Sequence, residues 1–142
     1  MDTDVLVAGI RSPAGASAAL LILLLNRRAT MLLSVALALE YESTALRAEH
    51  LYAAKATEAD VTNLIDAIIN VIEPVEVHYQ WRPQLSDAGD EMVLETAVNG
   101  RADAIVTFNR RHFGEIPSRF GIEVLSPAAA LETLCLHLML TP

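Results

Sequence analysis

Apolar segments of two kinds alternate along this chain, and the alternation limits the possible folds more than any other feature. Segments with helical start and stop signals are separated by short apolar runs that favour strands. The expected helices cover residues 16–28, 34–51, 57–71, 86–98 and 126–140, and the expected strands cover residues 2–7, 31–34, 73–78, 102–108 and 122–125. The third of these strands would end near Pro83. This order of elements predicts an α/β chain.

Polar residues stand at the expected helix starts. Ser34 and Thr57 can each act as an N-cap, and Thr57 is followed by first-turn acids. Either Ser86 or Asp87 begins the next helix. Ser126 precedes a proline that suits the first turn of the last helix. These signals predict helix starts in particular, because capping depends on residues close in sequence.

Strands joined through helices predict a mainly parallel sheet with helices on both faces, a three-layer α/β/α arrangement. Residues 1–142 are long enough for one domain with its own core and carry no linker or repeat. Ligands in such sheets bind beyond the carboxyl ends of the strands. Asn109 lies just past the expected strand at residues 104–108 and is therefore a candidate site residue.

The chain is apolar for a soluble protein, with 53% hydrophobic residues and a mean hydropathy of +0.36. Its longest apolar stretch, residues 14–25, is too short to cross a bilayer, and no basic segment precedes it. We therefore expect a soluble protein without a membrane partner.

Cys135 is the single cysteine, which excludes an internal disulfide and fits a reducing cytoplasm. It is expected in the core, within the apolar last helix.

The net charge of −8 argues against a general nucleic-acid coat protein. Lys55 is the only lysine, so arginine supplies the other positive charges. Arginines cluster at residues 27–28 and at residues 110–111 with Arg119, and their forked guanidinium groups can bind phosphate even on an acidic protein. The pair at 27–28 also fits a helix C-terminus, where cations are favourable.

Carboxylates occur at three widely separated places, each beside an apolar segment. They are Asp2 with Asp4, Glu40, and Asp87 with Asp90. Two unit charges about 5 Å apart repel by roughly 3 kcal/mol at an effective dielectric of about 20. A fold that gathers these acids must either let them protonate or hold a divalent cation. We interpret them as a hard-metal site for phosphodiester hydrolysis.

Each acid also has a structural interpretation when it is taken alone. Asp87 can cap the helix that follows, and Asp90 then complements the helix N-terminus. Glu40 suits a solvated helix surface. Asp2 and Asp4 fit an acidic chain terminus. Composition does not show that these residues converge.

Several segments together resemble a known family, the PIN-domain ribonucleases, and most of all the toxin components of bacterial and archaeal toxin–antitoxin pairs (VapC-like). The resembling segments are residues 2–7, 11–16, 34–41, 87–97, 100–109 and 111–113, which span nearly the whole chain in the family's order.

The resemblance implies roles for individual residues. Asp2, Glu40 and Asp90 would form an acidic centre that binds Mg²⁺ or Mn²⁺, and Asn109 would be the fourth catalytic position. The possible supporting residues are Asp4, which stands where the family usually has asparagine, Asp87 as an outer ligand or cap, and Thr107, which could orient a carboxylate by hydrogen bonding. The implied partners are an RNA substrate and a cognate antitoxin protein.

The chain departs from the family pattern at two points. Only Met1 precedes Asp2, whereas family members have several strand residues there. Either the first strand is truncated or the natural start lies upstream. In the family the stretch after this acid turns towards helix, which conflicts with the strand expected at residues 2–7. Asn109 is neutral, so one tightly bound ion is expected rather than two.

Water activated at such a centre would leave 5′-phosphate and 3′-hydroxyl ends.

The four histidines have no spacing typical of a zinc site or an acid–base pair, and His112 is expected as a surface or partly packed residue. A phosphoryl-aspartate receiver is disfavoured because no lysine lies late in the chain. A catalytically inactive PIN-like protein-binding module remains the alternative. The apolar last helix would suit a homodimer.

Overall fold

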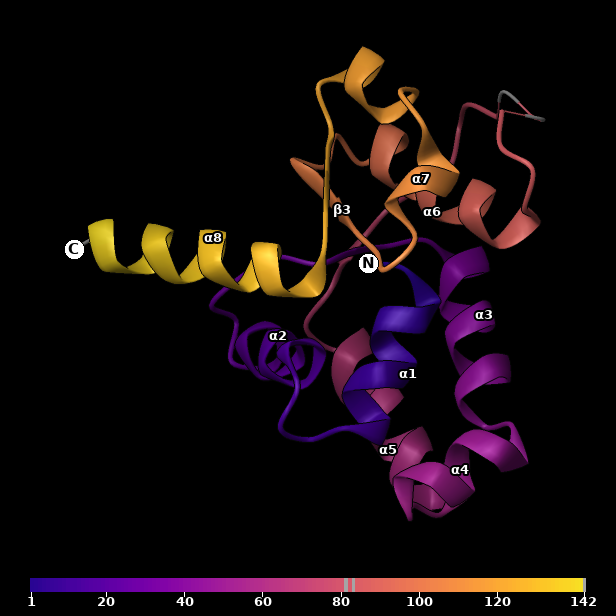
Figure 1. Ribbon diagram of the computed structural model, residues 1–142. Coiled ribbons are helices and arrows are strands. Elements are labelled where there is room, and N and C mark those ends of the chain that lie inside the picture. Colours follow the sequence, from indigo (N-terminus) through magenta and orange to yellow (C-terminus); the bar gives the residue numbers. More distant parts are fainter. Residues whose placement is uncertain (81, 83, 142) are drawn as a thin grey trace.

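The protein was analysed as a computed structural model that describes residues 1–80, 82 and 84–141 (Figure 1). The described helices are α1 (Thr3–Arg11), α2 (Ala16–Leu25), α3 (Val35–Ala45), α4 (Ala48–Ala54), α5 (Glu58–Ile69), α6 (Ala88–Asn99), α7 (Arg110–Phe113) and α8 (Pro127–Leu140), with a 3₁₀-helix η1 at Pro117–Phe120. The described strands are β1 (Leu32–Leu33), β2 (Glu73–Pro74), β3 (Ala104–Val106) and β4 (Glu123–Leu125).

The strands pair in parallel, as the alternation of elements predicts, but the described residues form two separate two-stranded sheets, β1–β2 and β3–β4. Leu32 pairs with Glu73 in the first sheet, and Ile105 pairs with Val124 in the second. The α/β character and the parallel pairing are therefore present, while a single central sheet is not clearly formed. The first residues lie beside β3, because the backbone N–H of Asp2 donates to the carbonyl of Val106 at 2.9 Å.

The strand expected at residues 2–7 is wrong, because the chain enters α1 at Thr3. Val5, Leu6 and Val7 are all buried, and a short apolar run that is buried on every side has no periodicity to distinguish helix from strand. The expected strand at residues 73–78 is also shortened to Glu73–Pro74. Its expected end near Pro83 lies outside the described residues.

The helix starts agree with the capping signals, and the helix ends agree less well. Ser34 accepts a hydrogen bond from the Leu37 N–H at 3.3 Å, and Thr57 forms a full capping box. The helix from Ser34 ends at Ala45 rather than near residue 51, because Arg47 is extended (φ −61°, ψ 136°) before α4 begins. Neither proline nor glycine marks this break.

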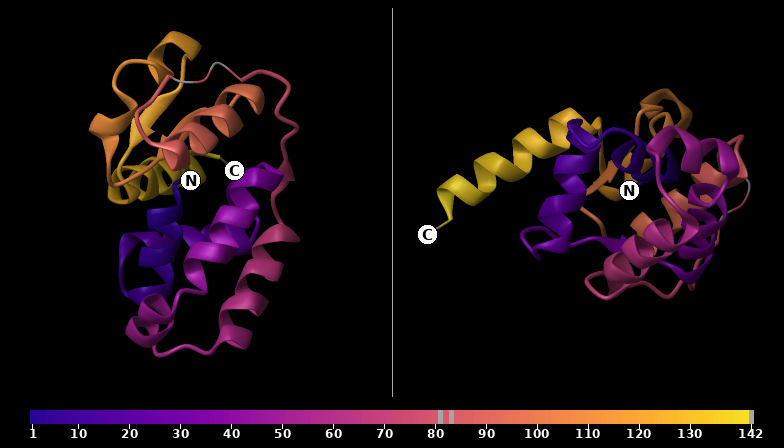
Figure 2. Two further views of the ribbon diagram at one scale, coloured as in Figure 1. Left: turned by 90° about the vertical axis from the view of Figure 1, so that its right-hand side faces the viewer. Right: turned by 90° about the horizontal axis from the view of Figure 1, so that it is seen from below.

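The core gathers side chains from helices and strands far apart in sequence. Leu6, Tyr41, Ile68, Ile105 and Phe113 are among its fully buried members. Figures 1 and 2 show helices α1–α5 at one end of the molecule and the segment from α6 to β4 at the other, with the first residues between them. Residues 1–4 therefore lie where both groups of elements can contribute side chains.

Helix α8 extends away from the rest of the molecule in Figure 1, and only Pro127 and Ala130 of its residues are buried. Cys135 is half-buried rather than in the core, so the expectation for this thiol is wrong. Within the described residues no single helix is long and apolar enough to cross a membrane. Helices α1 and α2 together reach such a length and composition, but they are bent by 100°.

Candidate acidic site

Asp2 is held at the start of α1 by a threonine that follows β3. The carboxylate is buried, and its Oδ2 accepts a hydrogen bond of 2.6 Å from the Thr107 hydroxyl, which is fully buried. Asp2 is the N-cap residue of α1, yet its side chain makes no capping hydrogen bond. The carboxylate is therefore directed to Thr107 rather than to its own helix.

Asn109 extends this network to the next acid. Its backbone N–H donates to the Thr107 hydroxyl oxygen at 3.0 Å, and its side-chain Nδ2 donates to Oδ2 of Asp4 at 3.3 Å. Asp4 is exposed in the first turn of α1, where its charge complements the helix N-terminus. Thr107 and Asn109, at the two ends of a three-residue segment, therefore contact Asp2 and Asp4.

Asp90 lies in the first turn of α6 and is buried. Asp87 caps this helix, because its Oδ1 accepts from the N–H groups of Gly89 at 2.8 Å and Asp90 at 3.1 Å. Burial raises the pKa of the Asp90 carboxyl, and the negative charges of Asp2 and Asp87 raise that pKa further. His112 opposes this shift, since its Nδ1 lies 3.2 Å from Oδ2 of Asp90. The charge of Asp2 is therefore one of the causes that raise the pKa of the Asp90 carboxyl, after burial.

Tyr41, a residue of α3, contacts the backbone next to Asp2. Its fully buried hydroxyl donates to the carbonyl of Met1. Burial raises the pKa of the tyrosine hydroxyl, and the neighbouring charge of Asp2 raises it further. A phenol that stays neutral in this way is a permanent hydrogen-bond donor, and it joins α3 to the residues around the acidic pair.

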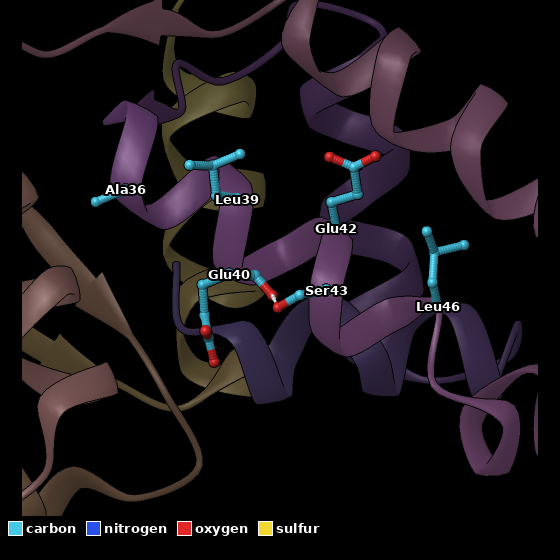
Figure 3. Close-up of a pocket in the computed structure, with 6 residues that line it drawn as sticks. All are labelled: Ala36, Leu39, Glu40, Glu42, Ser43 and Leu46. Carbon is cyan, nitrogen blue, oxygen red and sulfur yellow. Dashed lines mark hydrogen bonds between the residues drawn. The ribbon is translucent and has the colours of Figure 1, made fainter.

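Glu40, the residue before Tyr41, is only partly buried and makes a different contact. Its Oε1 accepts from the Thr44 hydroxyl at 3.2 Å, one turn along α3. It also lines a cavity of about 520 Å³ on the outer side of this helix, with Ala36, Leu39, Glu42, Ser43 and Leu46 (Figure 3). Among the described residues, no hydrogen bond joins Glu40 to Asp2 or Asp90.

A metal centre formed by Asp2, Glu40 and Asp90 stays a prediction. Within residues 1–80, 82 and 84–141, no group of three or more His, Cys, Asp or Glu side chains is arranged to hold a metal ion. The pair Asp2 and Asp90 still offers two carboxylates with mutual repulsion, and Mg²⁺ commonly binds through one or two carboxylates together with water and substrate phosphates. This oxygen-donor pair fits one hard divalent cation better than zinc.

His112 is the contact that the sequence did not predict. It occupies α7, one helical turn after Asn109, and its approach to Asp90 depends on how α7 packs against α6. The available signal was its position three residues after a candidate site residue. Histidine spacing alone could not reveal it, because its partner is a carboxylate 22 residues earlier.

One of the three comparisons with known proteins identifies a family. The family model described as PIN domain matches residues 1–111. This range contains Asp2, Glu40, Asp90 and Asn109, and it ends before β4 and α8. The search of curated proteins found no match. The search of solved structures found no match either. PIN domains are generally nucleases that typically use divalent metal ions. The chain belongs to the PIN domain family.

Proposed function

We propose that this protein is a metal-dependent endoribonuclease that hydrolyses phosphodiester bonds in RNA. The proposal is supported by the hydrogen bond that holds the buried Asp2 to Thr107, by the buried Asp90 in the first turn of α6, and by the match to the PIN domain family. Uncompensated negative charge in one place favours a bound cation.

Asp2 and Asp90 would hold Mg²⁺ or Mn²⁺, with Glu40 as a further ligand if its carboxylate leaves Thr44. The bound cation would offset charge on the phosphoryl oxygens and lower the pKa of water. Thr107 keeps one oxygen of Asp2 occupied, so the other oxygen is directed for ligation. Asp87 keeps Asp90 at the start of α6 through the helix cap.

Water rather than the neighbouring 2′-hydroxyl is the expected nucleophile, so the products would carry 5′-phosphate and 3′-hydroxyl ends. Labelling of the product ends checks this expectation. Fragments that end in a 2′,3′-cyclic phosphate would show that the 2′-hydroxyl attacks instead.

The test of the proposed function is RNA cleavage by the full chain with Mg²⁺ or Mn²⁺ and with EDTA. Asp90→Asn should remove most of the cleavage while far-ultraviolet circular dichroism stays unchanged. Asp66→Asn is the matched control, because Asp66 is an exposed carboxylate on α5. Retained cleavage with ordinary metal dependence in Asp90→Asn would reject the role of this carboxylate.

The alternative function is a catalytically inactive PIN-like module that binds a protein partner. The neutral Asn109 and the lack of a three-residue metal group in the described chain favour it. Titration with Mn²⁺ separates the two functions. A binding module would show no Mn²⁺-dependent cleavage of any RNA, even at Mn²⁺ concentrations that saturate the protein.

The cellular role that we propose is the toxin of a toxin–antitoxin pair, on the basis of the resemblance of residues 2–7, 11–16, 34–41, 87–97, 100–109 and 111–113 to such toxins. The antitoxin would be a small protein encoded in the neighbouring reading frame. Expression of this chain should arrest growth, and coexpression of that small protein should relieve the arrest. Arrest by the Asp90→Asn variant would contradict a toxic effect through cleavage.

We also propose a homodimer that uses α8, because Leu136, Met139 and Leu140 on this helix are exposed. A helix of 14 residues is about 21 Å long, and half of its lateral surface is about 350 Å². Two copies would therefore bury about 700 Å² through α8 alone, which is small for a stable dimer. Sedimentation at low micromolar concentration should show a weak dimer that Met139→Glu abolishes. A strict monomer at every concentration would reject the dimer.

A further inference from the structure

One short segment contacts three acids of the site, which are Asp2, Asp4 and Asp90. Thr107 donates to Asp2 at 2.6 Å, Asn109 donates to Asp4 at 3.3 Å, and His112 lies 3.2 Å from Asp90. These three residues belong to the stretch from the end of β3 through α7. The stretch therefore forms one wall of the acidic site.

The same wall presents an aromatic side chain and two arginines to solvent. Phe108 is 54% exposed although it lies between the residues that contact Asp2 and Asp4. Arg110 and Arg111 are exposed, and in the described part of the chain neither forms a salt bridge. The core position of this stretch is taken by the fully buried Phe113, so packing does not require Phe108.

An exposed aromatic ring beside free arginines matches the chemistry of single-stranded nucleic acids. Unpaired bases stack on aromatic side chains, and guanidinium forks bind the phosphates between them. A duplex does not offer its base faces to such a ring. The positive charges also stand out on a chain with a net charge of −8, where general attraction to phosphate is weak.

We infer that Phe108, Arg110 and Arg111 bind single-stranded RNA beside the acidic site. Phe108 stacks on one unpaired base, and the two arginines hold flanking phosphates, which places the strand along Asp2 and Asp90. This inference rests on the proposed ribonuclease function, and it names three residues that bind the RNA beside the acidic site.

The experiment is fluorescence anisotropy with a short labelled single-stranded RNA and with its duplex, using the full-length Asp90→Asn protein in EDTA to prevent cleavage. Phe108→Ala should weaken binding of the single strand about 5- to 150-fold, the range seen when one base-stacking ring is removed. Phe108→Tyr, which keeps a ring, should restore it. Tyr52→Ala is the control, since Tyr52 is an aromatic residue on α4 with 88% exposure.

The arginines are tested through the salt dependence of binding. Removing both with Arg110→Ala and Arg111→Ala should reduce the slope of log K against log salt by about 1.4, since each phosphate contact on a single strand contributes about 0.7. Removing the exposed Arg11 and Arg47 by alanine substitution is the charge-matched control and should leave the slope unchanged.

Three results would overturn the inference. They are absence of RNA binding, duplex binding as tight as single-strand binding, or wall variants that bind like the controls. If the wall variants bind normally while cleavage still requires metal and Asp90, this inference fails and the proposed function stands. If binding depends on Phe108 but neither metal supports cleavage, the proposed function fails and the RNA site stands.

Discussion

Thr107→Val tests whether the acidic site depends on one buried hydroxyl. The substitution keeps the shape of the side chain but removes both of its hydrogen bonds, the one donated to Asp2 at 2.6 Å and the one accepted from the Asn109 N–H at 3.0 Å. A bond to a charged group contributes about 1.5–3 kcal/mol, and a neutral bond contributes about 0.5–1.5 kcal/mol. The free energy of unfolding should therefore fall by about 2–4.5 kcal/mol.

Urea denaturation followed by circular dichroism measures this loss. Thr107→Ser is the matched control, because it keeps the hydroxyl and loses one buried methyl, which costs about 1 kcal/mol. A double-mutant cycle with Asp2→Ala, which removes the acceptor, should give a coupling of about 1.5–3 kcal/mol between the two side chains. The reasoning is refuted if Thr107→Val loses less stability than Thr107→Ser, because the methyl would then matter more than the hydrogen bonds.

Three further predictions follow from single contacts. Gly9→Ala should destabilise the protein by about 1 kcal/mol by urea denaturation, because the new Cβ would lie 2.5 Å from Cδ1 of Leu21 and overpacking outweighs the gain in helix propensity. Asp87→Ala should cost about 1 kcal/mol through the lost cap, whereas Asp87→Asn, which keeps an oxygen acceptor, should cost less in the same assay. Asp90→Asn should be more stable than the wild type at neutral pH in EDTA. The reason is that the raised pKa of Asp90 means its ionised form opposes folding, so the difference should disappear as the pH falls below 3.8.

The capping signals show how far local sequence reaches in this chain. Ser34, Thr57, Asp87 and Ser126 each accept hydrogen bonds at the helix start where a cap is expected. Both partners of such a bond lie within three residues, so the sequence contains the whole interaction. The end of α3 at Ala45 had no local signal, and the expected continuation to residue 51 fails for that reason.

The same difference between local and distant contacts applies to the candidate site. Resemblance drew attention to Asp2, Asp90 and Thr107, and the structure joins Asp2 to Thr107 by a hydrogen bond and to Asp90 by charge. The roles of these residues in catalysis stay predictions. Glu40 was expected with them, and its place there stays a prediction; in the structure its carboxylate accepts from the Thr44 hydroxyl one turn away on its own helix. The choice between a local and a distant partner depends on packing, which composition does not describe.

The order of the apolar segments along the sequence predicts that this chain combines helices with short parallel strands. The helix caps, which the sequence also contains, predict where most helices begin. Tertiary structure alone decided that residues 3–7 coil into α1, that the strands form two pairs, and that His112 meets Asp90. The physical reason is the distance along the chain between the residues that interact. A cap is complete within one turn, whereas the state of a buried apolar run and the partner of a charged side chain depend on segments brought together only when the core forms.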